Sequence, residues 1–253
     1  MHTELSVVIP VYNSQDSIKF VVESLLEQYA TSYEMEIILV NDGSIDQSHE
    51  ICSILASHHL NVTLLDLKKN YGQQAAILQG LRVAQGDYIA LMDDDMQNPP
   101  EELIKLMNKI DEGFEVVIGQ RVKYNQTIFR RLISYLNNLL VNWLLHSKKR
   151  IYFSNFIVMK KPIATEILKN LTPNPNILGL MLQITNNIAN TPTEHRIRKD
   201  GKSNYTLLKL LKYWFNMLPF VTTRRIRVLV YSALLFILFL VITCICLLIL
   251  FEN

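Results

Sequence analysis

The chain is 253 residues long, which is enough for one large domain or for one domain with an appendage. Apolar residues make up 49% of the sequence but are unevenly spread, and the formal net charge is only +2. We expect no nucleic-acid partner. Of the three cysteines, two lie inside one long apolar segment near the C-terminus, a distribution that supports neither a disulfide framework nor a zinc site.

Residues 1 to about 120 alternate short apolar strands with amphipathic helices. The expected strands are rich in β-branched residues and bounded by turn residues: Leu5–Ile9, Glu36–Val40, Val62–Leu67, Tyr88–Met92 and Val116–Ile118. The expected helices are one through Ile18–Leu26 with Ser14 as its N-cap, then Asp46–His58, Gln73–Gln85 and Glu101–Glu112. This alternation predicts an α/β fold with a mostly parallel sheet covered on both faces.

Four of the expected strands run directly into polar loops. These loops are Pro10–Asn13, Asn41–Ser44, Lys68–Gly72 and Asp93–Asp95. Ligands of such sheets bind beyond the carboxyl ends of the strands. One polar loop there is ordinary, but four that converge on the same edge are better explained by a pocket for a nucleoside diphosphate.

The loop Asp93–Asp95 places three carboxylates in a row, where they repel one another. Mg²⁺ and Mn²⁺ take oxygen ligands and commonly bridge to substrate phosphates. Alternate residues of an extended segment point the same way, so Asp93 and Asp95 can converge on one ion while Asp94 faces elsewhere. The alternative is a solvated acidic turn that caps the next helix.

The C-terminal segment Val228–Phe251 contains no charged residue and is long enough to cross a bilayer as one helix. A buried core helix is the alternative. Arg224, Arg225 and Arg227 precede the segment, so the positive-inside rule places the N-terminal part in the cytosol. No secretory signal precedes the first expected strand.

Two other stretches carry apolar stripes. Leu207–Leu218 has a broad apolar face opposite Lys209 and Lys212, which predicts an interfacial helix lying on the bilayer. Packing on the domain's own core is the alternative for this stretch. For the stripe within Ile128–His146, packing in the core or between subunits is the default interpretation, which leaves a homo-oligomer open.

The motifs Ser-Val-Val-Ile-Pro-Val-Tyr-Asn, Val-Asn-Asp-Gly-Ser, Asn-Tyr-Gly-Gln and Asp-Asp-Asp-Met-Gln-Asn-Pro-Pro-Glu resemble those of inverting family-2 glycosyltransferases with a GT-A fold. More narrowly, they resemble the dolichyl-phosphate mannose synthase-like branch, which includes bacterial undecaprenyl-phosphate sugar transferases. The resemblance covers about residues 5–121 and resumes at Arg198–Tyr205 and the membrane anchor. It implies transfer of a sugar from a nucleotide-sugar to a polyprenyl phosphate at the cytosolic face of a bacterial inner membrane.

The resemblance also implies a role for particular residues and a division of the chain. We expect a catalytic GT-A domain at 1–200, a basic juxtamembrane segment at 201–227 and a single transmembrane helix at 228–251. The implied roles are substrate contact for Pro10, Tyr12, Asn13, Asp42, Asn70, Gln97, Arg121, Asn155 and Ser203, Mg²⁺ or Mn²⁺ binding for Asp93 and Asp95, and catalysis for Asp95, Arg198 and Lys202. For Arg121 an ordinary surface arginine is the alternative, and for Arg198–Tyr205 a basic loop attracted to anionic lipid.

The sequence departs from the family pattern in three places. Asn155 and Ile157 stand where relatives commonly carry an acid and an arginine, Ser14 and Gln15 stand where the family often has an acid, and Thr172–Leu178 lacks the arginines usual in that region. A lipid phosphate is ionised before it attacks, so it needs cations more than a general base, and Arg198 and Lys202 favour such an acceptor. The alternatives are a hydroxyl acceptor, such as a lipid-linked saccharide, and a catalytically impaired membrane scaffold.

Overall fold

The computed structural model describes residues 4–121, 151–152, 154–170 and 176–196, all within one unit of the chain, Met1–Asn204. The stretches expected at 128–146, 207–218 and 228–251 lie outside these residues. In the described ranges, no helix has both the length and the hydrophobicity needed to cross a bilayer.

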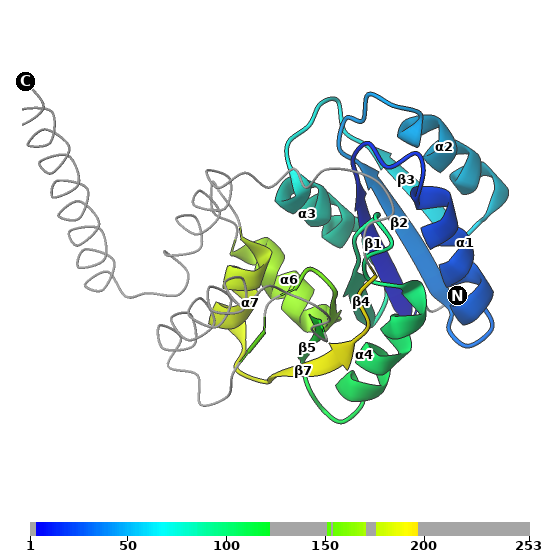
Figure 1. The fold of residues 1–253 in the computed structure, drawn as a ribbon. Coiled ribbons are helices and arrows are strands. Elements are labelled where there is room, and N and C mark those ends of the chain that lie inside the picture. Colours follow the sequence, from blue (N-terminus) through cyan, green and yellow to red (C-terminus); the bar gives the residue numbers. More distant parts are fainter. Residues whose placement is uncertain (1–3, 122–150, 153, 171–175, 197–253) are drawn as a thin grey trace, which may run out of the picture. The chain divides into compact units, whose positions relative to one another are not determined.

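A seven-stranded mixed sheet runs through the described residues (Figure 1), in the order β3-β2-β1-β4-β6-β5-β7. All pairings are parallel except those of β6, which runs antiparallel to β4 and to β5. The strands are β1 (Leu5–Val11), β2 (Met35–Asn41), β3 (Val62–Asp66), β4 (Tyr88–Leu91), β5 (Val116–Arg121), β6 (Ile157–Lys160) and β7 (Ile188–Thr193). The five strands expected from sequence are confirmed, and β6 and β7 are additions to them.

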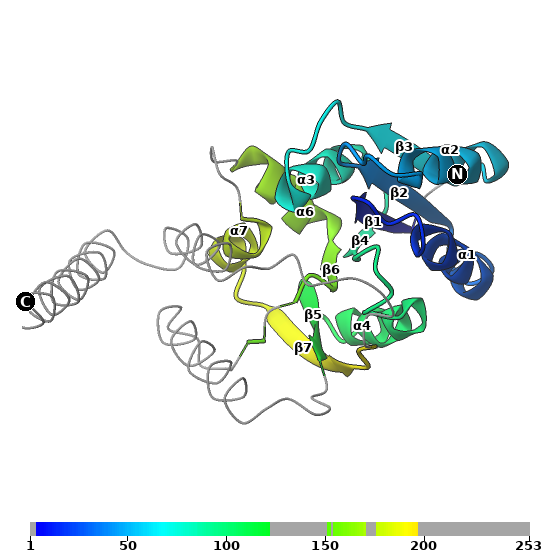
Figure 2. The ribbon, with the colours of Figure 1, turned by 45° about the horizontal axis from the view of Figure 1, so that its top comes forward.

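Helices cover both faces of the sheet, as the sequence predicts (Figures 1 and 2). One face carries α1 (Ile18–Tyr29), α2 (Ser48–His58) and α4 (Leu103–Ile110), and the last of these follows a short 3-10 turn, η1 (Pro100–Glu102). The other face carries α3 (Gln73–Val83) and α6 (Lys161–Lys169), and α7 (Ile177–Ile184) packs on α6.

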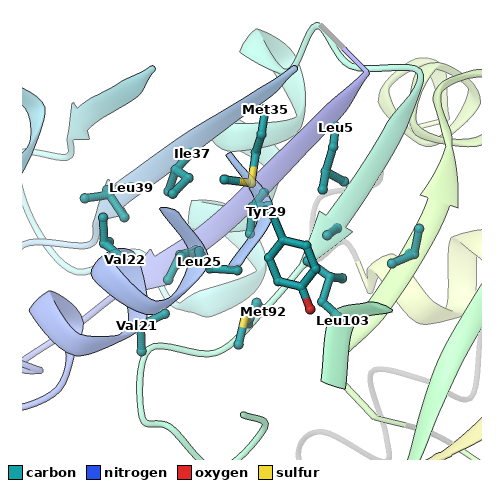
Figure 3. Packing of buried hydrophobic residues seen from close by; sticks show 14 of the residues in the cluster. Leu5, Val21, Val22, Leu25, Tyr29, Met35, Ile37, Leu39, Met92 and Leu103 are labelled. Carbon is teal, nitrogen blue, oxygen red and sulfur yellow. The ribbon is translucent and has the colours of Figure 1, made fainter. Parts of the chain in front are cut away.

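The core between the sheet and α1 is built from alternate residues of the central strands (Figure 3). Leu25 and Tyr29 of α1 pack there with Ile37 of β2 and Leu103 of α4. The Tyr29 hydroxyl donates to the Pro100 carbonyl at 2.9 Å and accepts from the amide of Ile104 at 3.1 Å. Burial raises the pKa of Tyr29 to about 12, so the hydroxyl stays neutral and fastens α1 to the start of α4.

The start of α1 differs from the expectation. The helix begins at Ile18 with Ser17 in the N-cap position, and Ser14 lies a full turn earlier. The prediction of Ser14 as the N-cap is therefore wrong. Its side chain instead reaches the loop that follows β4.

The directions of the strands decide where their polar ends meet. Because β1, β2, β3, β4, β5 and β7 all run the same way, their carboxyl ends share one edge of the sheet. The antiparallel β6 begins at that same edge, so the residues that precede it arrive there too. Within the described residues, the loops that the sequence analysis marks as candidate sites therefore lie along one edge.

Gly80 tests how closely α3 packs on this sheet. A Cβ at Gly80 would overlap Cγ1 of Val8 and lie 3.3 Å from Cγ2 of Val40, both of them β-branched residues of inner strands. We expect Gly80→Ala to lower the free energy of unfolding, because about 1–3 kcal/mol of overpacking exceeds the roughly 1 kcal/mol of helix propensity gained. Thermal unfolding of the full chain in detergent measures this change. Arg82→Ala, at an exposed position of the same helix, is the matched control, and an equal effect of the two changes would contradict the prediction.

Candidate functional site

The carboxylate of Asp93 lies between two elements that the sequence keeps far apart. Its Oδ1 accepts from Gln73 Nε2 at 2.7 Å, at the first residue of α3, and from Asn155 Nδ2 at 3.4 Å, just before β6. Burial, followed by the neighbouring Asp95 and Asp94, raises the pKa of Asp93 to about 7. Asp93 therefore carries its charge poorly in the absence of a cation.

Asp94 faces the opposite way, as the sequence predicts. Its Oδ2 accepts from the backbone amide of Tyr12 at 3.0 Å and from the hydroxyl of Ser14, and its own carbonyl accepts from Ser17 Oγ at 2.6 Å. Burial raises the pKa of Asp94 to about 6, against the lowering effect of these hydrogen bonds. The middle carboxylate of the triplet thus joins the loop after β4 to the loop after β1.

Asp95 shapes its own loop and lies near a residue that sequence reasoning missed. Its Oδ1 accepts from the amide of Gln97 at 3.0 Å, and the carbonyl of Gln97 accepts from the amide of Arg196 at 2.9 Å. These bonds bring His195, which follows β7, close enough for the charge of Asp95 to raise its pKa. Burial and then the charge of Arg121 outweigh that effect and lower the pKa of His195 overall.

His195 Nδ1 is buried and has no hydrogen-bond partner among the described residues. Two contacts hold the backbone on either side: Arg196 pairs with Glu101, and the amide of Glu194 donates to Glu102 Oε2 at 2.8 Å. A buried nitrogen without a hydrogen-bond partner, in a residue close to Asp95, has the character of a ligand group. The only signal in the sequence was the position of His195 at the end of β7, a strand that was not predicted.

Asp42 holds the loop after β3 in place. Its two carboxylate oxygens accept from the amides of Tyr71 at 2.7 Å and Gly72 at 2.8 Å. Next to it, Gly43 has φ +66°, and a Cβ there would lie 2.5 Å from the carbonyl carbon of Lys69. Burial raises the pKa of Asp42, although the two amides oppose this effect. The predicted contact of Asp42 with a nucleotide stays a prediction.

The other predicted residues are distributed as follows. Pro10 is buried within β1, whereas Tyr12 is 42% exposed and available to a ligand. Asn13 adopts φ +53° and uses its side-chain oxygen to accept from the amide of Ile45 at 3.0 Å. Asn70 is exposed, and Arg121 ends β5 at the site edge. Arg198, Lys202 and Ser203 lie outside the described residues.

The acidic loop has the chemistry of a cation site. Among the described residues, no three or more His, Cys, Asp or Glu side chains close around one point. Asp93 and Asp95 nevertheless lie close enough for the charge of Asp95 to raise the pKa of Asp93, and the imidazole of His195 lies close enough to Asp95 to feel its charge. A divalent cation would remove the repulsion between these carboxylates.

The raised pKa of Asp93 makes stability depend on pH. The protonated form is favoured in the folded state, so Asp93 stabilises the fold below the ordinary aspartate range, and this contribution is lost as the pH rises to about 7. In chelator, we expect the melting temperature of the wild type relative to Asp93→Asn to fall across that window. A difference between the two proteins that stays constant with pH would contradict this prediction.

Comparison with known proteins gives the family. The family described as Glycosyl transferase family 2 matches residues 6–168. Undecaprenyl-phosphate 4-deoxy-4-formamido-L-arabinose transferases of Salmonella typhimurium (strain LT2) and Salmonella newport (strain SL254) are each 33% identical over 234 residues, which is 89% of this chain and 70% of theirs.

Solved structures show the same fold. Glucosyl-3-phosphoglycerate synthase from Mycobacterium tuberculosis superposes with a TM-score of 0.67 at 16% identity, covering 87% of this chain and 80% of the synthase. S. aureus TarS in complex with UDP-GlcNAc gives 0.56 at 20% identity, covering 80% of this chain and 62% of TarS. The match over most of the sequence, together with this α/β architecture, shows that the chain belongs to glycosyl transferase family 2.

Proposed function

We propose that this glycosyltransferase moves one sugar from a nucleotide-sugar to a polyprenyl phosphate, with inversion at the sugar. The observation that carries the proposal is the Asp93–Asp95 loop, which hydrogen bonds join to the loop after β1 and to α3 at the carboxyl edge of the sheet. The Salmonella relatives are named for transfer to undecaprenyl phosphate. The M. tuberculosis synthase has been solved in complex with Mn²⁺ and UDP-glucose.

The ligand set fits Mg²⁺ or Mn²⁺. Asp93 and Asp95 would supply carboxylate oxygens, and His195, which lies near Asp95, is a candidate for a further, nitrogen ligand of the kind that suits Mn²⁺. A divalent cation bound there would stabilise the negative charge that develops on the leaving nucleoside diphosphate. The desolvation that raises the pKa of Asp93 and Asp94 would also strengthen the interaction of this charge with the cation.

The nucleotide would lie along the loops after β1, β2 and β3. The exposed ring of Tyr12 provides an apolar surface for a base, and Asp42 and Asn70 lie in or beside the loops that flank it. Arg121 is close enough to His195 for its charge to lower the pKa of the imidazole. That position supports a phosphate contact for Arg121 rather than the role of an isolated surface arginine.

The environment of Asn155 favours a phosphate acceptor. Its amide donates to Asp93, and an amide cannot accept a proton at neutral pH. A hydroxyl acceptor would need a base at this place, whereas a lipid phosphate arrives ionised. We therefore assign acceptor positioning to Arg198, Lys202 and Ser203, and keep transfer to a hydroxyl as the second candidate.

A lipid acceptor requires the enzyme to work at a membrane. The uncharged segment Val228–Phe251, preceded by Arg224, Arg225 and Arg227, would anchor the catalytic part on the cytosolic side of a bacterial inner membrane. The juxtamembrane segment 201–227 would bring the basic residues to the lipid head groups.

The metal ligands can be tested by binding. Asp95→Ala in the full chain should abolish the Mn²⁺-dependent part of nucleoside diphosphate binding, because one hard ligand is lost. His195→Ala should weaken Mn²⁺ binding, which electron paramagnetic resonance measures directly. Asp111→Ala, which removes an exposed carboxylate near the start of β4, is the control. Equal nucleotide affinity of the wild type with and without chelator would count against the whole site.

The acceptor can be tested by comparing two variants. Arg198→Ala should reduce transfer to undecaprenyl phosphate at least about tenfold more than Asn155→Ala, because cationic positioning replaces general-base catalysis here. The measurement is incorporation of radiolabelled sugar into extracted lipid, with a panel of nucleotide-sugars. The opposite ranking, or a product linkage that resists the mild acid that cleaves sugar phosphates, would favour a hydroxyl acceptor.

A further inference from the structure

Asp94, the middle aspartate of the triplet, makes its hydrogen bonds mainly to the segment after β1 and not within the loop after β4. Asp94 accepts two hydrogen bonds at its carboxylate, from the amide of Tyr12 and the hydroxyl of Ser14, and a third at its carbonyl from Ser17 Oγ. All three donors belong to the segment Tyr12–Ser17, which leads from β1 into α1. We call this segment the β1 loop.

The β1 loop is held on its other side by the loop after β2. The amide of Ser14 donates to Ser48 Oγ at 2.7 Å, and the amide of Asn13 donates to Ser44 Oγ at 3.1 Å. The amide of Ile45 in turn donates to Asn13 Oδ1 at 3.0 Å. The loops after β1, β2 and β4 therefore form one hydrogen-bonded unit, with Asp94 as the member that reaches the acidic loop.

We propose that Asp94 is a positioning residue that couples cation binding at Asp93 and Asp95 to nucleoside binding by the β1 loop. The proposal rests on the proposed function, because it takes the cation site and the nucleotide loop from there. Through Asp94, each ligand orders the loop that the other one needs. The two therefore bind cooperatively even where they do not touch.

The proposed coupling has a physical basis, because Asp94 is adjacent in sequence to both of the carboxylates that would hold the cation. Asp94 lies directly between the two carboxylates that would hold the cation, so fixing Asp93 and Asp95 fixes the backbone of Asp94 as well. If the carboxylate of Asp94 moved away, the Tyr12 amide and the part-buried Ser14 hydroxyl would lose this acceptor, so the position of Asp94 affects the stability of the β1 loop. If the first ligand has already ordered the β1 loop, the second ligand binds without the entropic cost of ordering it again.

A neutral nucleoside makes it possible to test the coupling through Asp94 apart from direct contact between the cation and the phosphates of a nucleotide. A nucleoside diphosphate touches the cation through its phosphates, so its metal dependence says nothing about Asp94. A nucleoside without phosphate has no such contact, and any effect of Mn²⁺ on its affinity must pass through the protein. Linkage requires the effect to be reciprocal, so the nucleoside must raise the affinity for Mn²⁺ by the same factor.

The experiment uses the full chain in detergent and titrates a panel of nucleosides with and without saturating Mn²⁺. We expect Mn²⁺ to raise the affinity of the preferred nucleoside roughly fivefold or more in the wild type, in the usual range of such couplings. Ser14→Thr keeps the hydroxyl and should keep the factor, whereas Ser14→Ala should bring it close to one. Ser57→Ala removes the hydroxyl of an exposed serine on α2 and is the control.

If nucleosides bind too weakly to titrate, hydrogen exchange tests the coupling through Asp94 instead. Mn²⁺ alone should slow hydrogen exchange in a peptide that covers Tyr12–Ser17 of the wild type, but not of Ser14→Ala. Asp94→Asn, which retains an oxygen acceptor, should show partial slowing. A protein that unfolds gives fast exchange everywhere and is recognised by comparison with a peptide from β2.

The outcomes distinguish this inference from the function on which it rests. If Mn²⁺ tightens nucleoside diphosphate binding but changes neither nucleoside affinity nor exchange at the β1 loop, the coupling through Asp94 is wrong and the site assignment stands. Absence of any Mn²⁺ effect on nucleoside diphosphate binding would instead overturn the proposed function.

Discussion

Three adjacent carboxylates can occupy one partly buried turn only when each has hydrogen-bond donors of its own, and this requirement organises the site. The side chain of Asp93 takes its donors from α3 and from the residues before β6, that of Asp94 from the loop after β1, and that of Asp95 from the turn itself. The hydrogen bonds that these carboxylates require thus join the elements that meet at the edge of the sheet. The same bonds leave the outer two carboxylates close together, which is an arrangement that a divalent cation stabilises.

The sequence predicted five of the seven strands, and the clearest signals came from inner strands that are buried on both faces. Residues of β1 and β2 are almost all buried, and inner parallel strands of this kind appear as uninterrupted β-branched runs. β7 escaped prediction because Ile-Ala-Asn-Thr-Pro-Thr has neither such a run nor an alternation, and its proline is tolerated because β7 pairs with β5 alone among the described strands. Missing β7 also meant missing His195, which only that strand brings to the site.

The structure explains in physical terms why Asn155 and Ser14 can replace the acids of the family pattern. An acid at position 155 would have placed a further negative charge against Asp93, whereas the amide of Asn155 donates a hydrogen bond to it. Ser14 likewise donates to Asp94, where an acid would repel it. Neither contact could be predicted, because a sequence shows which residue type is replaced but does not show which partner that side chain will face. The direction of Asp94, by contrast, followed from the alternation of side chains along the chain.

The reversed direction of β6 gives the fold a tolerance for change. The chain leaves the sheet at Arg121, at the end of β5, and returns at Asn155, before β6, on the same edge. Both of these points lie at the edge of the site, whereas Ile151, shortly before the return, is buried in the core. Because neither point interrupts the pairing of β5 with β6, a change in chain length between them would leave that strand register intact. A protein with this topology can lengthen or shorten the chain there without rebuilding the sheet.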